Sequence, residues 1–386
     1  MKSFLKLLLW VVAFFASVTI LLYIFNVSYL IRAVRTVYLN GETTAFLGDY
    51  KEFPNREIKK GSPQPWNISK RYNIVKPTQK LLQTNDSLKT VAFLIIKNDS
   101  IWHESYFDNY TKDTKSNSFS MAKSIVTAAM GKAIMEGKIK SLDQKLTDFF
   151  PEYAGGFGDK VTIGDLSSMS SGLDWDEKYY SPFSITTRAY FDNNLNKVML
   201  GLKIRSEPGK EMKYLSGNTQ LLAMVLEKAT GEHLSDYVSK NFWQPMGAEN
   251  DALWQIDDPG GIEKAYCCIA SNARDFARFG KLYKQKGNWN GQQILDTAFV
   301  EKCTTPRFAD SKQYGYGWWL SDHFGKDIYF MQGHLGQYVI VIPEDDLIIV
   351  RLGHLRDERE DGNYHRKDFY VYIDEAYKMI NSDRKN

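Results

Sequence analysis

The chain has 386 residues, of which 43% are hydrophobic and 25% are charged, a composition that suits one large or two fused globular units. The formal net charge is +3 and the basic residues are spread along the chain, whereas nucleic-acid-binding proteins usually carry a basic patch. Nucleic acid is therefore not an expected partner. Three cysteines are too few for a disulfide framework, and the scattered histidines lack the spacing of a zinc motif, so we expect no metal and no cofactor.

A long apolar segment lies at the N-terminus. No charged residue occurs between Leu7 and Ile31, and residues 7–25 are almost wholly apolar. A bilayer-spanning helix needs about 20 such residues, whereas the apolar part of a secretory signal has about 7–15. We expect residues 1–31 to form an uncleaved, single-pass anchor with the rest of the chain on the extracytoplasmic side. A cleaved signal peptide and a buried helix are the alternatives. Basic residues flank both ends of the apolar segment, so charge alone does not predict the orientation of the segment in the membrane.

The next segment, residues 32–79, shows no sustained hydrophobic periodicity and is expected to be a connector that joins the domain surface. The globular domain is expected over residues 80–386. No candidate functional residue precedes Val91, so we expect a chain without residues 1–31 to keep its function.

Strand patterns lie at the two ends of the globular domain, and helical patterns lie between them. The strands are expected at residues 91–97, 101–107, 315–320, 328–332, 338–342 and 347–352. Residues 142–302 are mostly helical in pattern, and a last helix is expected near residues 369–380. This order predicts an α/β (α+β) fold with a mixed, largely antiparallel sheet built from both chain ends and flanked by helices. A mostly helical domain is inserted at about residues 142–302.

A candidate nucleophile opens the expected helix at residues 120–136. In Ser120-Met-Ala-Lys123, positions i and i+3 share a helix face, so the Lys123 amine can lie beside the Ser120 oxygen. A serine hydroxyl needs such a base, and burial would lower the pKa of the lysine. The backbone N–H groups at the helix start would favour a developing oxyanion. The alternative is that Ser120 is an ordinary helix N-cap.

A second candidate group is Tyr214-Leu-Ser216, which follows a turn and precedes a helix. A tyrosine between Lys123 and a leaving group could relay a proton, either as phenolate or through its hydrogen bonds. The alternative is a half-buried tyrosine, with Ser216 or Asn218 capping the next helix.

A third candidate group, His334-Leu335-Gly336-Gln337, lies between two strand patterns. Glycine in a strand often marks the close approach of a ligand to the backbone. The Gln337 N–H could form an oxyanion hole with the Ser120 N–H, and His334 could hydrogen-bond the tyrosine or a substrate carboxylate. The alternative is a glycine-rich β-turn.

Taken in order, these three groups resemble the Ser-x-x-Lys, Tyr-x-Ser/Asn and Lys/His-x-Gly signature of class C β-lactamases, penicillin-binding proteins and related serine hydrolases. The resemblance extends over roughly residues 91–377. Residues 171–179 look most like the branch of the 6-aminohexanoate-dimer hydrolases and related esterases. In that branch a tyrosine on this loop closes over the substrate amide, which implies Tyr179 here, with Tyr180 as the alternative.

The resemblance implies an acyl-enzyme mechanism and assigns roles to named residues. Ser120, Lys123 and Tyr214 would be catalytic, and the N–H groups of Ser120 and Gln337 would form the oxyanion hole. The residues expected to contact the substrate are Tyr179, Ser216, Asn218, His334 and Gly336.

One departure bears on the substrate. Dedicated β-lactamases carry Lys-Thr-Gly where this chain has His334-Leu335-Gly336, so efficient β-lactam hydrolysis is not expected. We expect hydrolysis of amide or ester bonds in small substrates, by an oligoamide or peptide amidase or a carboxylesterase. The alternatives are a β-lactamase or D,D-carboxypeptidase, and a non-catalytic membrane-anchored binding or sensor protein with the same fold.

Overall fold

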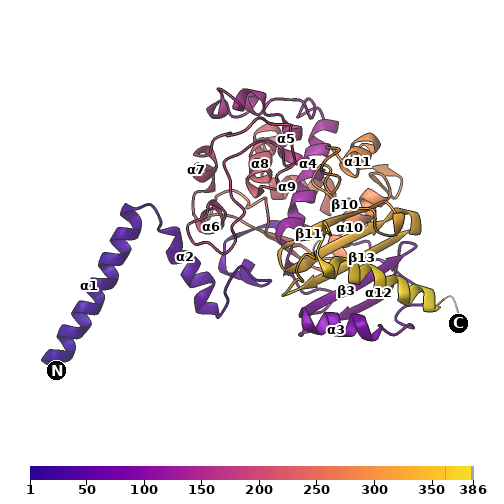
Figure 1. The fold of residues 1–386 in the computed structure, drawn as a ribbon, viewed down its shortest axis with the longest axis horizontal. Coiled ribbons are helices and arrows are strands. Elements are labelled where there is room, and N and C mark those ends of the chain that lie inside the picture. The colour runs from indigo at the N-terminus through magenta and orange to yellow at the C-terminus, as the bar shows by residue number, and fades with distance from the viewer. Residues whose placement is uncertain (361, 384–386) are drawn as a thin grey trace.

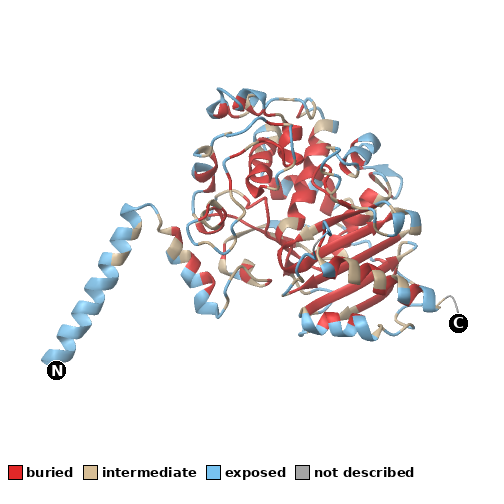
Figure 2. Cartoon of the chain, in the orientation of Figure 1, coloured by how far each residue is buried: buried red, intermediate tan, exposed pale blue. Residues whose placement is uncertain are grey.

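The computed structural model describes residues 1–360 and 362–383. Helix α1 (Lys2–Ile24) projects away from the rest of the molecule, and none of its residues is buried (Figures 1 and 2). Its 23 residues would span about 35 Å at the rise of an α-helix. By length and mean hydropathy (2.6) it could cross a membrane, and an N-terminal signal sequence meets the same criteria.

The main sheet has seven strands and contains segments from both ends of the globular part, as the sequence predicted. Its order is β10-β11-β12-β13-β3-β4-β2, and all neighbours are antiparallel except β2 and β4. The centre is formed by β3 from the N-terminal part and β13 from the C-terminal part, paired with Ile95 opposite Ile349. The strands are β2 (Asn67–Ile68), β3 (Thr90–Lys97), β4 (Ser100–Tyr106), β10 (Trp319–Ser321), β11 (Ile328–Gly333), β12 (Gln337–Ile342) and β13 (Leu347–Gly353).

Both faces of this sheet are covered, which explains why the central strands are apolar on both sides. Phe93 and Ile95 of β3 pack in the core beneath α3 (Gln79–Ser87) and α12 (Lys367–Asp383). Leu94 and Ile96 point to the opposite face, in the core that α4 (Ala122–Met135) and α10 (Ala273–Lys284) share. Figure 1 shows α12 across the first face.

Most other helices gather on one side of the sheet, beside α4 (Figure 1). They are α5 (Ile163–Ser167), α6 (Ile185–Phe191), α7 (Leu195–Leu200), α8 (Ser216–Thr230), α9 (Leu234–Val238) and α11 (Thr297–Cys303). Helix α10 also falls within residues 142–302, yet it packs against β12 and β13 of the main sheet.

Two smaller sheets complete the described structure, and the sequence did not indicate them. A four-stranded sheet in the order β1-β6-β7-β5 joins the connector to the body, and β8 and β9 form a short hairpin. These strands are β1 (Asn55–Ile58), β5 (Ser116–Asn117), β6 (Ala252–Gln255), β7 (Ile269–Ser271), β8 (Asn288–Trp289) and β9 (Gln292–Gln293).

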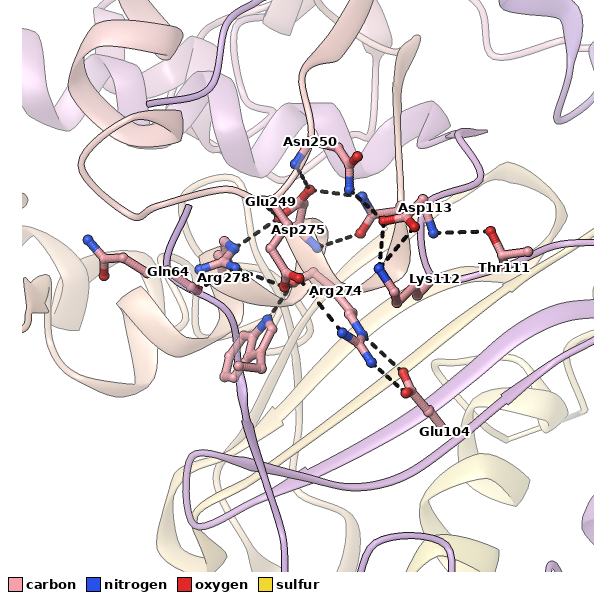
Figure 3. Close-up of polar contacts among 12 residues, drawn as sticks. Gln64, Glu104, Thr111, Lys112, Asp113, Glu249, Asn250, Arg274, Asp275 and Arg278 are labelled. Carbon is pink, nitrogen blue, oxygen red and sulfur yellow. Dashed lines mark hydrogen bonds and ion pairs between the residues drawn. The ribbon is translucent and has the colours of Figure 1, made fainter. Parts of the chain in front are cut away.

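Buried ion pairs fix α10 against the sheet and the loops around it (Figure 3). Arg274 donates to Glu104 on β4 with an Nε–Oε2 distance of 3.0 Å, and Arg278 donates to Asp275 with an Nε–Oδ1 distance of 3.0 Å. Arg278 also reaches Glu249 at 3.2 Å. Burial acts to raise the pKa of Glu104, but the hydrogen bonds from Arg274 and two tyrosines hold it below its ordinary value. Each of the buried charges named here therefore has a partner.

Candidate active site

Ser120 lies on a one-turn 3₁₀ helix (Phe119–Met121) that leads directly into α4. Phe119 has φ +45°, a left-handed conformation that is uncommon for a non-glycine residue and that turns the chain just before the serine. Lys123, one turn further on, places its Nζ 2.9 Å from the Ser120 Oγ. The structure thus brings together the two groups that the i, i+3 spacing predicted.

The Lys123 amine is enclosed. Lys123 is 2% exposed, and its Nζ also donates to the Tyr266 carbonyl oxygen at 2.7 Å. Burial lowers the pKa of Lys123 to about 8, and the nearby Glu177 carboxylate opposes this decrease. An appreciable fraction of the amine is therefore neutral near pH 7, and a neutral amine can accept the Ser120 proton.

Tyr214 completes the cluster on the other side of Ser120. Its ring centroid lies 5.1 Å from the Lys123 Nζ, and the ring packs on Trp319 at 5.2 Å between centroids. Burial raises the pKa of the Tyr214 hydroxyl, while its hydrogen bond with Ser120 acts in the opposite direction. The hydroxyl therefore stays protonated near neutral pH, which favours a hydrogen-bonded relay over a phenolate.

The end of β11 passes close to the Ser120 turn. A Cβ on Gly333 would overlap the Ser118 carbonyl oxygen, so glycine is required for this approach. Gly333 and His334 line the cavity at Ser120. Gln337 is fully buried behind them, and its side-chain amide donates to the His334 and Gly353 carbonyl oxygens at 3.0 and 2.7 Å.

The placement of the third group thus differs from the sequence expectation. Among the described residues, those lining the cavities at Ser120 include His334 but neither Gln337 nor Gly336. Gly336 has φ +79°, and a Cβ on this residue would crowd the Arg351 guanidinium. We infer that the His334 N–H is a better candidate than the Gln337 N–H for the second oxyanion donor.

The His334 ring is buried and uncharged. Burial lowers its pKa to about 3, and the positive charges of Arg356 and Arg366 add to the effect. The ring stacks on Tyr179 at 5.2 Å between centroids, and neither of its nitrogens has a hydrogen-bond partner within the described structure. His334 can therefore offer a substrate a hydrogen bond but not a charge.

Two of the other predicted substrate contacts line the cavities, and one does not. Tyr179 and Ser216 both lie along the space next to Ser120. Asn218 is fully buried, accepts a hydrogen bond from Ser171 and directs its Nδ2 to the Met169 sulfur at 3.8 Å. Asn218 thus supports the loop before Tyr179 and has no access to a ligand.

Glu177 is a site residue that sequence reasoning missed. Its carboxylate accepts a hydrogen bond from the Ser216 backbone N–H. Burial raises the pKa of Glu177, and the charge of Lys123 opposes the increase. The one sequence signal was its place within residues 171–179, the segment that resembles the amidase branch.

Three arginines at the site were also missed. Arg356, Arg359 and Arg366 line a cavity of about 150 Å³ that also contains Ser120 and Tyr214. Burial and the charge of Arg366 lower the pKa of Arg356. Such a group of guanidinium ions suits a carboxylate or phosphate group.

A second, apolar cavity of about 340 Å³ meets the first at Ser120. Residues that precede Val91 line it, from the end of the segment expected to be the anchor and from the connector, whereas the absence of a catalytic residue before Val91 stays a prediction. They belong to helix α2 (Tyr29–Thr36) and the segment after it. Cys267 also lines this cavity and is disulfide-bonded to Cys268, while Cys303 is free and buried.

One acidic cluster elsewhere could hold a metal ion. Ligand atoms of Glu227, His233 and Glu263 lie within 4.8 Å of one another. Arg56 already pairs with Glu263 at 2.7 Å, and burial beside Glu263 raises the pKa of Glu227 to about 8. The ion pair with Arg56 and a proton on Glu227 thus reduce the negative charge of this cluster, and we assign it no role.

Comparison with known proteins agrees with this geometry. Residues 78–368 match the Beta-lactamase family. The 6-aminohexanoate-dimer hydrolase of Paenarthrobacter ureafaciens is 26% identical over 292 residues, which cover 69% of this chain and 73% of that protein.

Solved structures share the fold. A Bacillus anthracis protein assigned as a 6-aminohexanoate-dimer hydrolase superposes with a TM-score of 0.72 at 21% identity, covering 90% of this chain and 95% of the other. The D-amino acid amidase of Ochrobactrum anthropi SV3 superposes with a TM-score of 0.57 at 15% identity, covering 78% and 99%. The resemblance to this family is thereby confirmed, and the chain belongs to the Beta-lactamase family of serine hydrolases.

Proposed function

We propose that the protein cleaves amide or ester bonds through a covalent acyl-enzyme, with Ser120 as nucleophile. The observation that carries this proposal is the 2.9 Å contact between the Ser120 Oγ and the buried Lys123 amine, whose pKa is lowered to about 8. A serine and a lysine with these properties form a nucleophile and base pair. A non-catalytic binding protein would not need to bury a lysine beside a serine.

The reaction proceeds in two halves. Ser120 Oγ attacks the substrate carbonyl carbon and transfers its proton to Lys123, and the backbone N–H groups of Ser120 and His334 stabilise the oxyanion. The Tyr214 hydroxyl donates a proton to the leaving nitrogen or oxygen and recovers one from Lys123, which leaves an ester on Ser120. Water then attacks this ester while the same groups accept its proton, and the acid is released.

The arginine cavity indicates what lies on the leaving-group side of the scissile bond. Tyr214, the proton donor to the leaving group, lines the same cavity as Arg356, Arg359 and Arg366. A leaving group with a carboxylate or phosphate therefore fits best. We favour amides over esters as the substrates, because relatives include a 6-aminohexanoate-dimer hydrolase and a D-amino acid amidase.

A β-lactamase or D,D-carboxypeptidase is the second candidate, because the same arginines can hold the carboxylate of a β-lactam or a peptide. The neutral His334 supplies none of the charge that the lysine of Lys-Thr-Gly would provide. Comparing nitrocefin with a linear amide that carries a carboxylate would separate the two activities.

The test of the nucleophile uses the full chain and a fluorophosphonate probe, with the mass of the intact protein as readout. Ser120→Ala removes one oxygen and should abolish labelling without changing the Tm by more than a few degrees. Ser124→Ala is the matched control, because Ser124 lies one turn further along the same helix and donates to the Gly317 carbonyl oxygen instead. Normal labelling of Ser120→Ala would refute the assignment.

A further inference from the structure

The apolar cavity beside Ser120 has two walls from distant parts of the sequence. The first wall is one face of the region around α2, with the spacing i, i+3, i+4 and i+7 that places side chains on the same side of a helix. The second wall is the loop after Tyr179 together with α6. The first wall contains Leu30, Ala33, Val34 and Val37, and the second contains Tyr180, Pro182, Phe183, Tyr190 and Phe191.

The walls are joined directly. The Tyr29 hydroxyl of α2 donates to the Pro182 carbonyl oxygen at 2.9 Å, and the residues of α2 contact α6. Tyr29 and Ala33 are buried in this contact, so α2 belongs to the core of the protein. The segment that follows the apolar N-terminal helix is thus built into the active site.

The chemistry of the lining selects an apolar ligand. None of the described lining residues is an aspartate, glutamate, lysine or arginine, and the one histidine, His334, is uncharged. A charged group placed here would lose its water without gaining a partner, which is strongly unfavourable. At about 340 Å³ the cavity falls within the size range of ligand pockets and exceeds what a short acyl group occupies.

The position of α2 indicates where such a ligand comes from. Four residues, 25–28, separate the end of α1 from the start of α2, and the five steps from Ile24 to Tyr29 span at most about 18 Å. If α1 spans a bilayer, α2 lies at its surface. Tyr38, Tyr180 and Phe183 line the cavity and are also exposed, and tyrosine is enriched at membrane interfaces.

We propose that this cavity binds the long acyl chain of a membrane amphiphile, which enters from the bilayer past α2, a proposal that rests on the serine-hydrolase function above. The apolar cavity holds the acyl side of the scissile bond, and the arginine cavity holds an anionic group on the leaving side. Ser120 lies where the two cavities meet. The substrate class is therefore a long-chain amide or ester with an anionic head group.

The first experiment measures selectivity for chain length with the full-length protein in phosphatidylcholine vesicles. The probes are p-nitrophenyl acetate and p-nitrophenyl decanoate, which differ by eight methylenes. With kcat/KM expressed against the ester concentration free in water, full burial of a methylene corresponds to about fourfold, so burying half of them should favour the decanoate about 200-fold. Equal kcat/KM values for the two esters would overturn the proposal.

Matched variants connect that selectivity to α2. Val34 and Ile31 lie on the same helix and are 48% and 42% exposed, but only Val34 lines the cavity. Val34→Asp should reduce the decanoate-to-acetate ratio at least tenfold, whereas Ile31→Asp should change it less than twofold. Phe183→Asp, on the opposite wall and 73% exposed, provides a second test if Val34→Asp fails to fold. An unchanged ratio in a folded Val34→Asp or Phe183→Asp protein would contradict the assignment of this cavity.

The second experiment tests entry from the bilayer. A p-nitrophenyl stearate ester desorbs slowly from vesicles, because each methylene adds about 0.8 kcal/mol of membrane affinity, or about fourfold. Hydrolysis should be at least tenfold faster when enzyme and ester share vesicles than when they are in separate vesicles. Equal rates would show that the chain arrives through water.

The outcomes separate this proposal from the function on which it rests. If the wild-type protein neither reacts with a fluorophosphonate nor hydrolyses either ester, the serine-hydrolase function itself fails. If it reacts with the probe and hydrolyses the acetate at least as well as the decanoate, only the acyl-chain proposal fails.

Discussion

The protonation state of Lys123 should control how fast Ser120 reacts. An ordinary lysine with a pKa of 10.5 would be about 0.03% neutral at pH 7, whereas one with a pKa of about 8 is about 9% neutral. That difference is about 300-fold in reactive base, or about 3 kcal/mol. We expect the rate constant for fluorophosphonate labelling to rise about tenfold per pH unit below pH 8 and to become constant above it.

Glu177→Gln tests the cause of this dependence. The Glu177 carboxylate stabilises protonated Lys123 and so raises its pKa. Glutamine has nearly the same shape, and its oxygen can still accept the hydrogen bond from the Ser216 N–H. The pKa of Lys123 should therefore fall further, and the midpoint of the profile should move to lower pH. Asp176→Asn is the control, because it removes a neighbouring carboxylate that does not act on Lys123.

Labelling is the appropriate assay because it needs only Ser120 and its base. Second-order rate constants would be measured from pH 5.5 to 9.5 by the mass of the intact protein. A flat profile between pH 6 and 9 would show that Lys123 is not the base. A shift to higher pH in Glu177→Gln would show that the sign of the interaction with Lys123 is wrong.

Three further substitutions have defined outcomes. Lys123→Arg should slow labelling about as much as Lys123→Ala, at least about 100-fold, because a guanidinium stays protonated, and retention of a tenth of the wild-type rate would limit Lys123 to an electrostatic role. Arg356→Ala should raise KM about 10- to 150-fold for an N-acyl amino acid but not for its methyl ester, because a hydrogen bond to a charged group is lost; equal effects on both would exclude anion binding. Gly131→Ala should lower the Tm by several degrees in calorimetry, because its Cβ would overlap the Phe299 ring and overpacking costs about 1–3 kcal/mol. Gly201→Ala, which meets no contact tighter than 3.4 Å, should change the Tm little.

The centre of the main sheet could be predicted because its strands are long and apolar, whereas the edge strand β2 has two residues and was not predicted. Strands β3 and β13 have eight and seven residues, enough for their pattern to be visible in the sequence. The sheet formed by β1, β5, β6 and β7 has strands of two to four residues, which are too short to show a period. Its pairing depends on contacts between segments far apart in the chain.

The candidate site likewise has a part that could be predicted from the sequence and a part that could not. Ser120 and Lys123 are local, three positions apart on a helix, so their contact follows from helical geometry. The contribution of Glu177 depends on how its loop folds over Lys123, which no spacing encodes. Gln337 was expected at the oxyanion hole, which stays a prediction; Leu335 between the two residues has φ +63°, and of the two only His334 is among the described residues that line the cavity.

The sequence did not show Arg356, Arg359 and Arg366 as a basic cluster, because acidic residues lie between them. Acidic residues alternate with them along residues 356–360, so the segment has no net positive charge in the sequence. Three guanidinium groups gather at the cavity because Arg366, further along the chain, returns beside them.

The wall formed by α2 lies outside residues 78–368, the part of the chain that the family shares. On the proposed acyl-chain function, one part of the selectivity is thus encoded in a stretch of the gene separate from the stretch that encodes the chemistry. Exchange of the first 45 codons between relatives could alter which chains are accepted while leaving Ser120, Lys123 and Tyr214 untouched. Relatives compared only over the shared part would then appear to be equivalent enzymes, although their preferred substrates had diverged.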